Sequence, residues 1–308
     1  MIQSTTVGLR WDFPNFLVVG ASKSGTSSLY HYLKQHPEIG LSSVKETQFF
    51  NCDEIFGLGV DRFVDLYFDC SSSCKAIGDI TPSYLVRGEK VLPRILSVYG
   101  DKPPKIVVIM REPVSRAWSH YLHKVRSGEE NLSFEDAIAR EEERIEADPG
   151  GWWGYRNEGN YEHFIQKWLQ VIPRKNFLFI TTEELADDPE NVLSRLYRHV
   201  GVDPFFRAPD MSRKNVGGQI RSRWLLGMIA RQGVTKRIIK SIFPYRMRQK
   251  MKSRLIAYNT KTTTPEIEMT TEVRKQLAEF YIESNSRLAQ TIGRELDEWR
   301  QPDESEVR

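Results

Sequence analysis

A glycine-rich loop with one lysine and several hydroxyl groups is the first set of residues able to do chemistry. It runs from Gly20 to Ser28 and reads Gly-Ala-Ser-Lys-Ser-Gly-Thr-Ser-Ser. Glycines allow the backbone to approach a phosphate, the following helix offers unpaired N–H donors, and Lys23 adds a positive charge. Lys23 stands two residues before Gly25, whereas in nucleotide hydrolases the lysine directly follows the last glycine. The loop therefore predicts an anion site that departs from the hydrolase pattern.

A second anion site is predicted around Arg111. This arginine ends an apolar run and is followed by Glu112 and Pro113, with Ser119 two turns into the next helix. A guanidinium binds phosphate in a bidentate manner, and a serine hydroxyl adds a donor. The alternative is a surface ion pair between Arg111 and a nearby carboxylate. Together the two motifs predict two phosphate sites.

Strands that each lead into a helix must position both motifs. Short apolar runs that end before a helical pattern are typical of buried parallel strands. The predicted pairs are 15–20 with 26–35, 105–110 with 113–125, and 176–180 with 189–200. We expect an α/β fold of the P-loop nucleotide-kinase type, with three layers and a central parallel sheet of about five strands, built as a single domain over residues 1–308.

Further helical patterns lie outside these units. Residues 134–147 and 161–171 are expected to be helical, and 272–299 reads as a pair of amphipathic helices. Between them, residues 148–159 are rich in glycine and aromatic side chains, which predicts a mobile loop. We expect its part from Gly150 to Gly159 to gate an acceptor site.

The two motifs together carry a family resemblance. Residues 16–26 and 109–121 resemble the two phosphosulfate-binding motifs of sulfotransferases that use 3′-phosphoadenosine-5′-phosphosulfate (PAPS), and they are most similar to the heparan sulfate (glycosaminoglycan) branch and its bacterial stand-alone relatives. The resemblance implies that Arg111 and Ser119 hold the 3′-phosphate of PAPS. It implies that the 5′-phosphosulfate is held by Lys23, Ser24, Gly25, Thr26 and Ser27.

The same resemblance supplies a catalytic carboxylate. In that branch the general base is a glutamate in a short motif after the first helix, which here places it at Glu46. Sulfuryl transfer also needs charge stabilisation on the leaving group, which falls to Lys23. The alternative for Glu46 is an ion pair with Lys45 or another lysine. A histidine base, His120 or His123, ranks second because small-molecule sulfotransferases use histidine.

Residues near the acceptor follow from similar family segments and from the aromatic loop. Ile80 stands where glycosaminoglycan enzymes commonly carry lysine, which weakens the case for an anionic sugar. A later segment, 213–215, resembles a loop that closes over PAPS through Arg213 and Lys214. The residues predicted to border the acceptor are Asp79, Thr81, Tyr84, Trp152, Trp153 and Tyr155. Asp79 is equally well explained as a cap of the next turn.

Composition excludes several classes of protein. The 308 residues carry no apolar run near the roughly 20 residues needed to span a bilayer, and no signal sequence is recognisable. Three cysteines without metal-ligand spacing predict neither a disulfide framework nor a zinc site. These features favour a cytoplasmic enzyme that needs no metal.

Positive charge is concentrated in one segment. Residues 211–265 hold 14 of the 44 lysines and arginines and none of the 41 acids. We interpret this segment as basic, mostly helical and part of the domain, with residues 221–254 able to touch an anionic membrane surface weakly. Nucleic-acid binding ranks last because no recognition motif is present.

The predicted function is sulfuryl transfer from PAPS to a hydroxyl, or less favourably an amine, of a small molecule such as a natural product, an alkaloid for example. A glycan or lipid acceptor is the alternative within the class. Rivals of another class are a P-loop phosphotransferase, which would need Mg²⁺ and an acidic ligand at a strand end, and a membrane-surface binding protein. The oligomeric state is left open.

Overall fold

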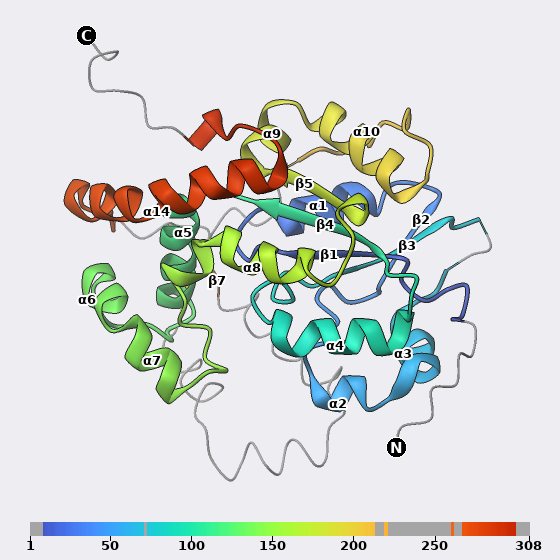
Figure 1. Cartoon of the computed structure of the whole chain (residues 1–308), viewed down its shortest axis with the longest axis horizontal. Helices are drawn as coiled ribbons and strands as arrows, with labels where there is room; N and C mark the ends of the chain where they lie inside the picture. The colour runs from blue at the N-terminus through green and yellow to red at the C-terminus, as the bar shows by residue number, and fades with distance from the viewer. Residues whose placement is uncertain (1–8, 71–72, 213–218, 221–259, 262–266, 300–308) are drawn as a thin grey trace. The chain divides into compact units, whose positions relative to one another are not determined.

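The centre of the fold is a five-stranded sheet whose strands are all parallel. In the computed structural model, which describes residues 9–70, 73–212, 219–220, 260–261 and 267–299, the order is β2-β3-β1-β4-β5 (Figure 1). The strands are β1 (Phe16–Gly20), β2 (Ile39–Leu41), β3 (Ala76–Ile80), β4 (Lys105–Met110) and β5 (Phe177–Thr181). Since parallel strands end at the same edge of a sheet, the loops after β1, β3, β4 and β5 gather there.

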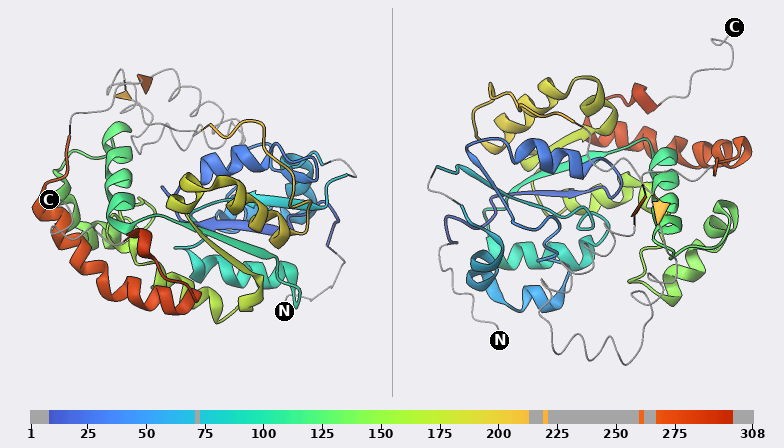
Figure 2. Two further views of the ribbon diagram at one scale, coloured as in Figure 1. Left: turned by 90° about the horizontal axis from the view of Figure 1, so that it is seen from above. Right: turned by 180° about the vertical axis from the view of Figure 1, so that it is seen from behind.

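Helices cover both faces of the sheet. Helices α1 (Thr26–Leu33) and α10 (Pro189–Val200) pack on one face, where Leu29 and Leu193 join a continuous apolar cluster with the strands. Helices α4 (Gly88–Tyr99) and α8 (Tyr161–Leu169) lie on the other side (Figure 2). The predicted three-layer α/β fold with about five parallel strands is confirmed.

Two of the strands were not recognised in the sequence. Strand β2 has only three residues, and β3 contains Gly78 and Asp79, which are uncommon in strands. Gly78 pairs with Phe16 on β1, and a Cβ atom at Gly78 would lie 2.1 Å from Cζ of Phe16. The glycine is therefore needed for the close contact between neighbouring strands.

The remaining elements complete the chain order. They are α2 (Asp53–Phe56), α3 (Gly59–Tyr67), α5 (Pro113–Arg126), α6 (Phe134–Ala139), α7 (Glu141–Ala147), α9 (Thr182–Asp187), the two-residue strands β6 (Gln219–Ile220) and β7 (Thr260–Lys261), which pair antiparallel, and α14 (Thr271–Ile292). Short 3-10 turns are η1 (Asn157–Gly159), η2 (Arg174–Asn176) and η3 (Asp297–Trp299). No helix of the described ranges is long and apolar enough to cross a membrane.

Two helix predictions differ from the structure. The pattern at 134–147 gives two helices, because the backbone at Arg140 leaves the helical region (φ −99°, ψ 11°). The region 272–299 contains one long helix, α14, and the short turn η3 rather than two helices. Gly293 in a left-handed conformation (φ 71°) ends α14, since glycine takes that conformation without strain.

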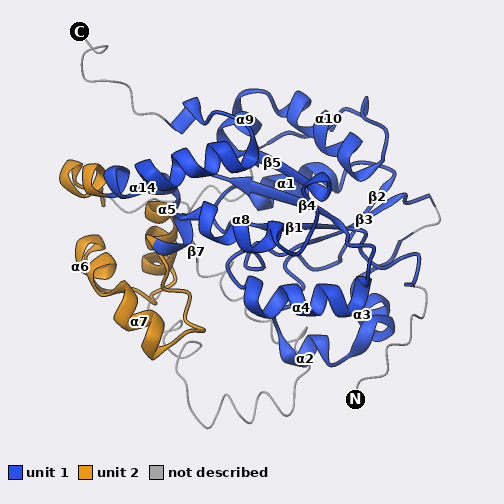
Figure 3. Ribbon diagram, in the orientation of Figure 1, with its two compact units in different colours: residues 1–116, 157–214, 277–308 blue, residues 117–156, 215–276 orange. Residues whose placement is uncertain are grey.

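Two compact units can be distinguished by their internal contacts (Figure 3). Unit 1 contains residues 1–116, 157–214 and 277–308 and includes the five-stranded sheet; unit 2 contains residues 117–156 and 215–276. The chain passes between the units several times, and the assignment of all residues to one domain stays a prediction. Most of the basic segment 211–265, including nearly all of 221–254, lies outside the described residues.

Candidate active site

The loop after β1 has the backbone shape of an anion site. Lys23 (φ 70°) and Gly25 (φ 85°) both adopt the left-handed conformation, which is uncommon for a lysine and marks a locally determined turn. Helix α1 begins immediately afterwards at Thr26, so its first N–H groups have no partners within the helix. A Cβ atom on Gly20 would lie 2.6 Å from Cβ of Leu85, so only glycine fits there.

One hydroxyl in this loop suits a bound anion. The Ser24 side chain is fully buried, and its Oγ meets full hydrogen-bond geometry with no described residue, although it lies near enough to the Tyr161 hydroxyl to lower the pKa of that group. A buried hydroxyl without a partner costs free energy, on the order of 1–3 kcal/mol, unless a ligand completes it. This orphaned atom fits a phosphate or sulfate oxygen in the loop. Thr26 is buried beside it, and Lys23 and Ser27 are half-buried.

Arg111 directly follows β4, which is the strand next to β1. The Tyr161 hydroxyl donates to the Arg111 carbonyl (2.9 Å) and accepts from the Arg111 N–H (3.4 Å). Burial raises the pKa of Tyr161 to about 12, so the phenol stays neutral and can do both. The guanidinium of Arg111 forms no ion pair or hydrogen bond within the described part of the chain. None of the carboxylates in the described ranges forms the surface ion pair that was the alternative, and the binding of an anion by Arg111 stays a prediction.

The helix after Arg111 begins with a side-chain cap. Both carboxylate oxygens of Glu112 accept backbone N–H groups of the first turn of α5, from Val114 (2.8 Å) and Ser115 (2.7 Å). Pro113 is buried in the first helical position, where its missing N–H costs nothing. Ser119 is half-buried on the part of α5 that belongs to unit 2. Its contact with a 3′-phosphate stays a prediction.

Glu46 belongs to the segment after β2 and is bonded to the last residue of β3, the strand on the other side of β1 from β4. Its backbone N–H donates to the carbonyl of Ile80 (3.1 Å), and both Glu46 (φ 64°) and Gln48 (φ 62°) have left-handed backbones. Strained residues of this kind cluster at functional sites. Oε1 of Glu46 pairs with Nζ of Lys45 at 2.5 Å, and 41% of the Glu46 side chain is exposed. The ion pair named as the alternative is therefore present, on a carboxylate that solvent can reach.

A buried group of polar side chains supports the segment that carries Glu46. Asp79 is fully buried and accepts from Thr47 (Oγ1, 2.9 Å), Thr81 (Oγ1, 3.0 Å) and Tyr84 (OH, 2.7 Å). Burial raises the pKa of Asp79. Thr81 and Tyr84 are themselves fully buried, so the three residues predicted to border the acceptor bond to one another and hold Thr47, next to Glu46. Their direct contact with an acceptor stays a prediction.

The part of the aromatic loop up to Arg156, including Trp152, Trp153 and Tyr155, lies in unit 2, and these three side chains have partners there. Tyr155 is fully buried and donates to Glu130 (2.7 Å), while Trp153 lies between Lys124 (4.0 Å) and Arg144 (3.9 Å). Tyr155 is therefore enclosed in this structure, and the gating of an acceptor by residues 150–159 stays a prediction.

The rival bases and the other predicted residues lie as follows. Trp152, with an unusual left-handed backbone (φ 56°), packs against the rings of His120 (4.0 Å) and His123 (5.6 Å). His120 is fully buried, which disfavours it as a base for a solvent-borne acceptor. Arg213 and Lys214 lie outside the described residues.

Residues after β5 were missed by sequence reasoning. Thr182 Oγ1 lies 2.9 Å from the carbonyl of Ser24 and 3.0 Å from that of Met110, so it joins the glycine-rich loop to the end of β4. The sequence did contain a signal for this turn, because Thr181 and Glu184 form a capping-box pattern at the start of α9, directly after a predicted strand. Among the described residues, no three histidine, cysteine or acidic side chains gather as they would around a metal ion.

The structure therefore brings the two predicted anion motifs to the ends of neighbouring strands, with the Glu46 carboxylate to one side. The loop after β1 lies between Arg111 at the end of β4 and Glu46, which is bonded to the end of β3. This arrangement suits transfer of a charged group between a nucleotide bound along the sheet edge and an acceptor near Glu46.

Comparison with known proteins identifies the family. The chain is 31% identical over 195 residues to the heparan sulfate glucosamine 3-O-sulfotransferase 6 of Mus musculus (63% of this chain, 54% of that protein). It is 26% identical over 211 residues to the bifunctional heparan sulfate N-deacetylase/N-sulfotransferase 2 of Bos taurus (62% and 22%). The chain thus spans between about a fifth and about half of these curated relatives.

A solved structure covers nearly the whole chain. The sulfotransferase from Alicyclobacillus acidocaldarius superposes with a TM-score of 0.68 and 30% identity, over 94% of this chain and 99% of that one. The family model described as sulfotransferase domain matches residues 13–305. The chain therefore belongs to the sulfotransferase family of enzymes, as its two phosphate motifs predict.

Proposed function

We propose that this protein transfers a sulfuryl group from PAPS to a hydroxyl, or alternatively an amine, of a small organic acceptor. The observation that carries the proposal is the Arg111 guanidinium, which has no protein partner in the described residues and follows the strand next to the glycine-rich loop. Two anion sites at this spacing suit a nucleotide with phosphate groups at both its 5′ and 3′ positions.

The donor would be held mainly through its charges. Lys23, Ser24 and the first N–H groups of α1 would bind the 5′-phosphosulfate, and Arg111 with Ser119 the 3′-phosphate. The unpartnered Oγ of Ser24 supports this, because a sulfate or phosphate oxygen would complete its hydrogen bonding. PAPS, when bound, supplies an activated sulfuryl group, and Lys23 would offset the charge left on the leaving phosphate.

Glu46 would act as general base on the acceptor. A carboxylate that solvent reaches, on a strained backbone beside the glycine-rich loop, can accept a proton from an acceptor hydroxyl. Because Lys45 contacts Oε1 of Glu46, the proton of the acceptor would go to Oε2, or to Oε1 once Lys45 has moved away.

A small-molecule acceptor is favoured over a sulfated glycan. The relatives named above act on heparan sulfate, which is anionic, yet Ile80 is buried and apolar where such enzymes commonly carry lysine. A glycan or lipid hydroxyl is the second candidate, supported by the names of those relatives alone. We also propose that the protein acts in the cytoplasm.

The donor site is tested by calorimetric titration with adenosine 3′,5′-bisphosphate (PAP). The wild type should bind it, and Arg111→Ala should weaken binding roughly 10- to 100-fold, because a charged hydrogen bond is lost. Arg198→Ala, an exposed arginine on α10, is the matched control and should bind normally. A wild-type protein that ignores PAP but binds ATP with Mg²⁺ would contradict the proposal.

The base is tested by turnover with ³⁵S-labelled PAPS and a panel of phenols, aliphatic alcohols and amines. Glu46→Gln should lower kcat by about 10²- to 10⁴-fold while PAP affinity stays unchanged. Glu146→Gln, an exposed glutamate on α7, is the control. If Glu46→Gln keeps full turnover, the base lies elsewhere.

A further inference from the structure

The turn after β5 contacts both anion motifs. Thr182 touches the glycine-rich loop through the Ser24 carbonyl (2.9 Å) and β4 through the Met110 carbonyl (3.0 Å). The next residue, Glu183, accepts the backbone N–H of Glu112 on Oε1 (3.2 Å). Because Glu112 directly follows Arg111, this carboxylate fixes the backbone on which the unpartnered guanidinium stands.

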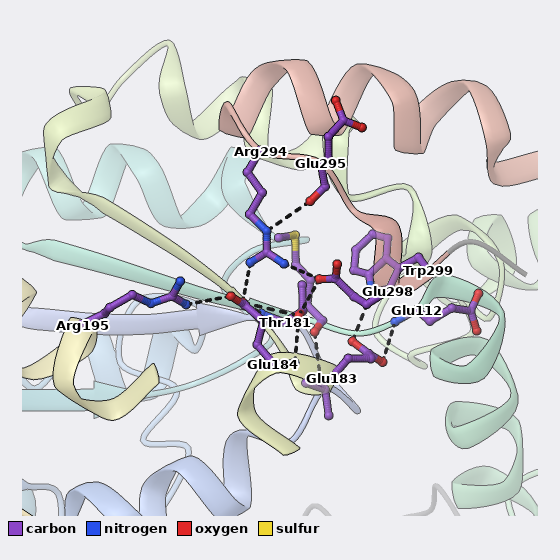
Figure 4. Close-up of polar contacts among 11 residues, drawn as sticks. Glu112, Thr181, Glu183, Glu184, Arg195, Arg294, Glu295, Glu298 and Trp299 are labelled. Carbon is purple, nitrogen blue, oxygen red and sulfur yellow. Dashed lines mark hydrogen bonds and ion pairs between the residues drawn. The ribbon is translucent and has the colours of Figure 1, made fainter. Parts of the chain in front are cut away.

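The other oxygen of Glu183 is held from the distant end of the described chain. Oε2 accepts Nε1–H of Trp299, in the turn η3, at 3.1 Å (Figure 4). The Trp299 side chain is nearly buried. Both carboxylate oxygens of Glu183 are thus used by N–H donors, which fixes the direction of the side chain.

A second set of contacts fastens η3 in place (Figure 4). The Thr181 hydroxyl donates to Oε1 of Glu298 (2.9 Å). Arg294 pairs with Glu184 (2.5 Å) and also with Glu298. Although burial raises it, the pKa of Glu184 is lowered overall, chiefly by its hydrogen bond with Arg294. The turn is therefore anchored by charged contacts of Glu298, the residue before Trp299, and of Arg294.

No side chain in the described ranges holds the Arg111 guanidinium, so among these residues its direction depends on the backbone. An arginine without side-chain partners samples many rotamers, so the position of its Cα and the direction of its Cβ decide where the charge lies. Tyr161 holds the N–H and carbonyl of Arg111, and Glu183 holds the following N–H. Tyr161 and Glu183 are the side chains that fix this backbone.

We propose that Glu183 is a positioning residue for Arg111 and that Trp299 keeps Glu183 in the orientation that does so. The proposal rests on the proposed function, since it assigns Arg111 to the 3′-phosphate. Glu183 and Trp299 would then set how strongly the protein distinguishes a nucleotide with a 3′-phosphate from one without it.

The test compares two ligands, PAP and adenosine 5′-monophosphate (AMP), by calorimetry. The ratio of the PAP affinity to the AMP affinity measures how much the 3′-phosphate contributes to binding. Glu183→Ala should lower this ratio about tenfold through weaker PAP binding, with AMP affinity unchanged, because one N–H acceptor beside Arg111 is lost. Trp299→Phe, which removes only the Nε1 donor, should lower the ratio about threefold. Glu190→Ala, an exposed glutamate on α10, is the matched control.

A rescue variant separates positioning from general weakening. Glu183→Gln keeps one oxygen for the Glu112 N–H but turns an amide donor toward Trp299, so it should lower the ratio. The double variant Glu183→Gln with Trp299→Phe no longer places two N–H donors against each other. It should therefore recover most of the wild-type ratio of PAP affinity to AMP affinity. In the background of Arg111→Ala, Glu183→Ala should change the ratio no further.

Three outcomes would overturn the proposal. In the first, the ratio of PAP affinity to AMP affinity stays at the wild-type value in Glu183→Ala, while Arg111→Ala strongly lowers it. In the second, Glu183→Ala weakens PAP and AMP binding equally, which indicates a loss of fold. In the third, the effects of Glu183→Ala and Arg111→Ala on the ratio are additive. Failure of the proposed function looks different, because the wild type itself then shows no preference for PAP over AMP.

Discussion

The phenol of Tyr84 donates a 2.7 Å hydrogen bond to Oδ2 of Asp79, and both side chains are completely buried. The same Tyr84 hydroxyl accepts the backbone N–H of Phe50 (3.2 Å). Together with Thr47, which also bonds to Asp79, these contacts join β3 to the segment that carries Glu46. The segment that carries Glu46 is therefore held in place by a buried ionisable group.

Asp79→Ala should destabilise the fold strongly. It leaves the hydroxyls of Thr47, Thr81 and Tyr84 without their shared acceptor, at a cost of about 3 kcal/mol in the free energy of unfolding. Denaturant unfolding followed by circular dichroism measures this. Ser83→Ala, a half-buried serine of the same loop, should cost less than about 1 kcal/mol. Equal effects of the two substitutions would show that Asp79 does not organise the segment.

Ser24→Ala should separate stability from ligand binding. Removing a buried hydroxyl that has no partner relieves an unfavourable burial, so the melting temperature should stay the same or rise. PAP affinity should fall roughly 3- to 10-fold, because the loop loses one donor to the anion. Differential scanning calorimetry with and without PAP measures both. A lower melting temperature in the absence of ligand would mean that Ser24 already has a structural partner.

Gly78→Ala should strain the contact between β1 and β3. The added Cβ would lie 2.1 Å from Cζ of Phe16, and overpacking of this kind costs about 1–3 kcal/mol. Adding Phe16→Leu should restore part of the loss by removing the clashing ring atoms. Gly150→Ala, whose Cβ would meet only Asp148 at 3.6 Å, is the control. The urea midpoints of the wild type and of these three variants measure the effect on stability.

Cys70 should react slowly with alkylating agents until the solution is strongly alkaline. Burial, and then the neighbouring Cys74 thiol, raises the pKa of Cys70 from 9.0 to about 11. The fold therefore favours the protonated thiol, and the stability that Cys70 contributes is present below pH 9 and lost as the pH rises to 11. Iodoacetamide labelling at Cys70, read by mass spectrometry from pH 8 to 11, tests this. Protein unfolded in urea is the control and should label rapidly near pH 9.

The parts of the fold that follow local pattern were predictable. Strand β4 and helix α10 were predicted with the bounds that the structure has, because one is an unbroken apolar run and the other begins at a proline. Strand β3 was not predicted, since Gly78 and Asp79 are placed by contacts with Phe16 and Thr47, far away in the sequence. A pattern within ten residues carries no information on such contacts.

The candidate site likewise contains residues that the local pattern predicted and residues that it did not. The glycine-rich loop and Arg111 were found because each stands directly between a strand and a helix. Thr182 and Glu183 were missed, since threonine and glutamate at the start of a helix are ordinary there, and their partners Ser24 and Trp299 lie more than a hundred residues away on either side. Asp79 was placed near the acceptor because its segment resembles one in the family, and its complete burial could not be read from the sequence.

The bond between Thr181 and Glu298 spans 117 residues, which matters while the protein is being made. A ribosome releases the glycine-rich loop and Arg111 long before it releases Trp299, so a nascent chain displays both anion motifs while Glu183 still lacks its second partner. The preference for a 3′-phosphate would then reach its full value only after residue 299 has been made and Trp299 has bonded to Glu183.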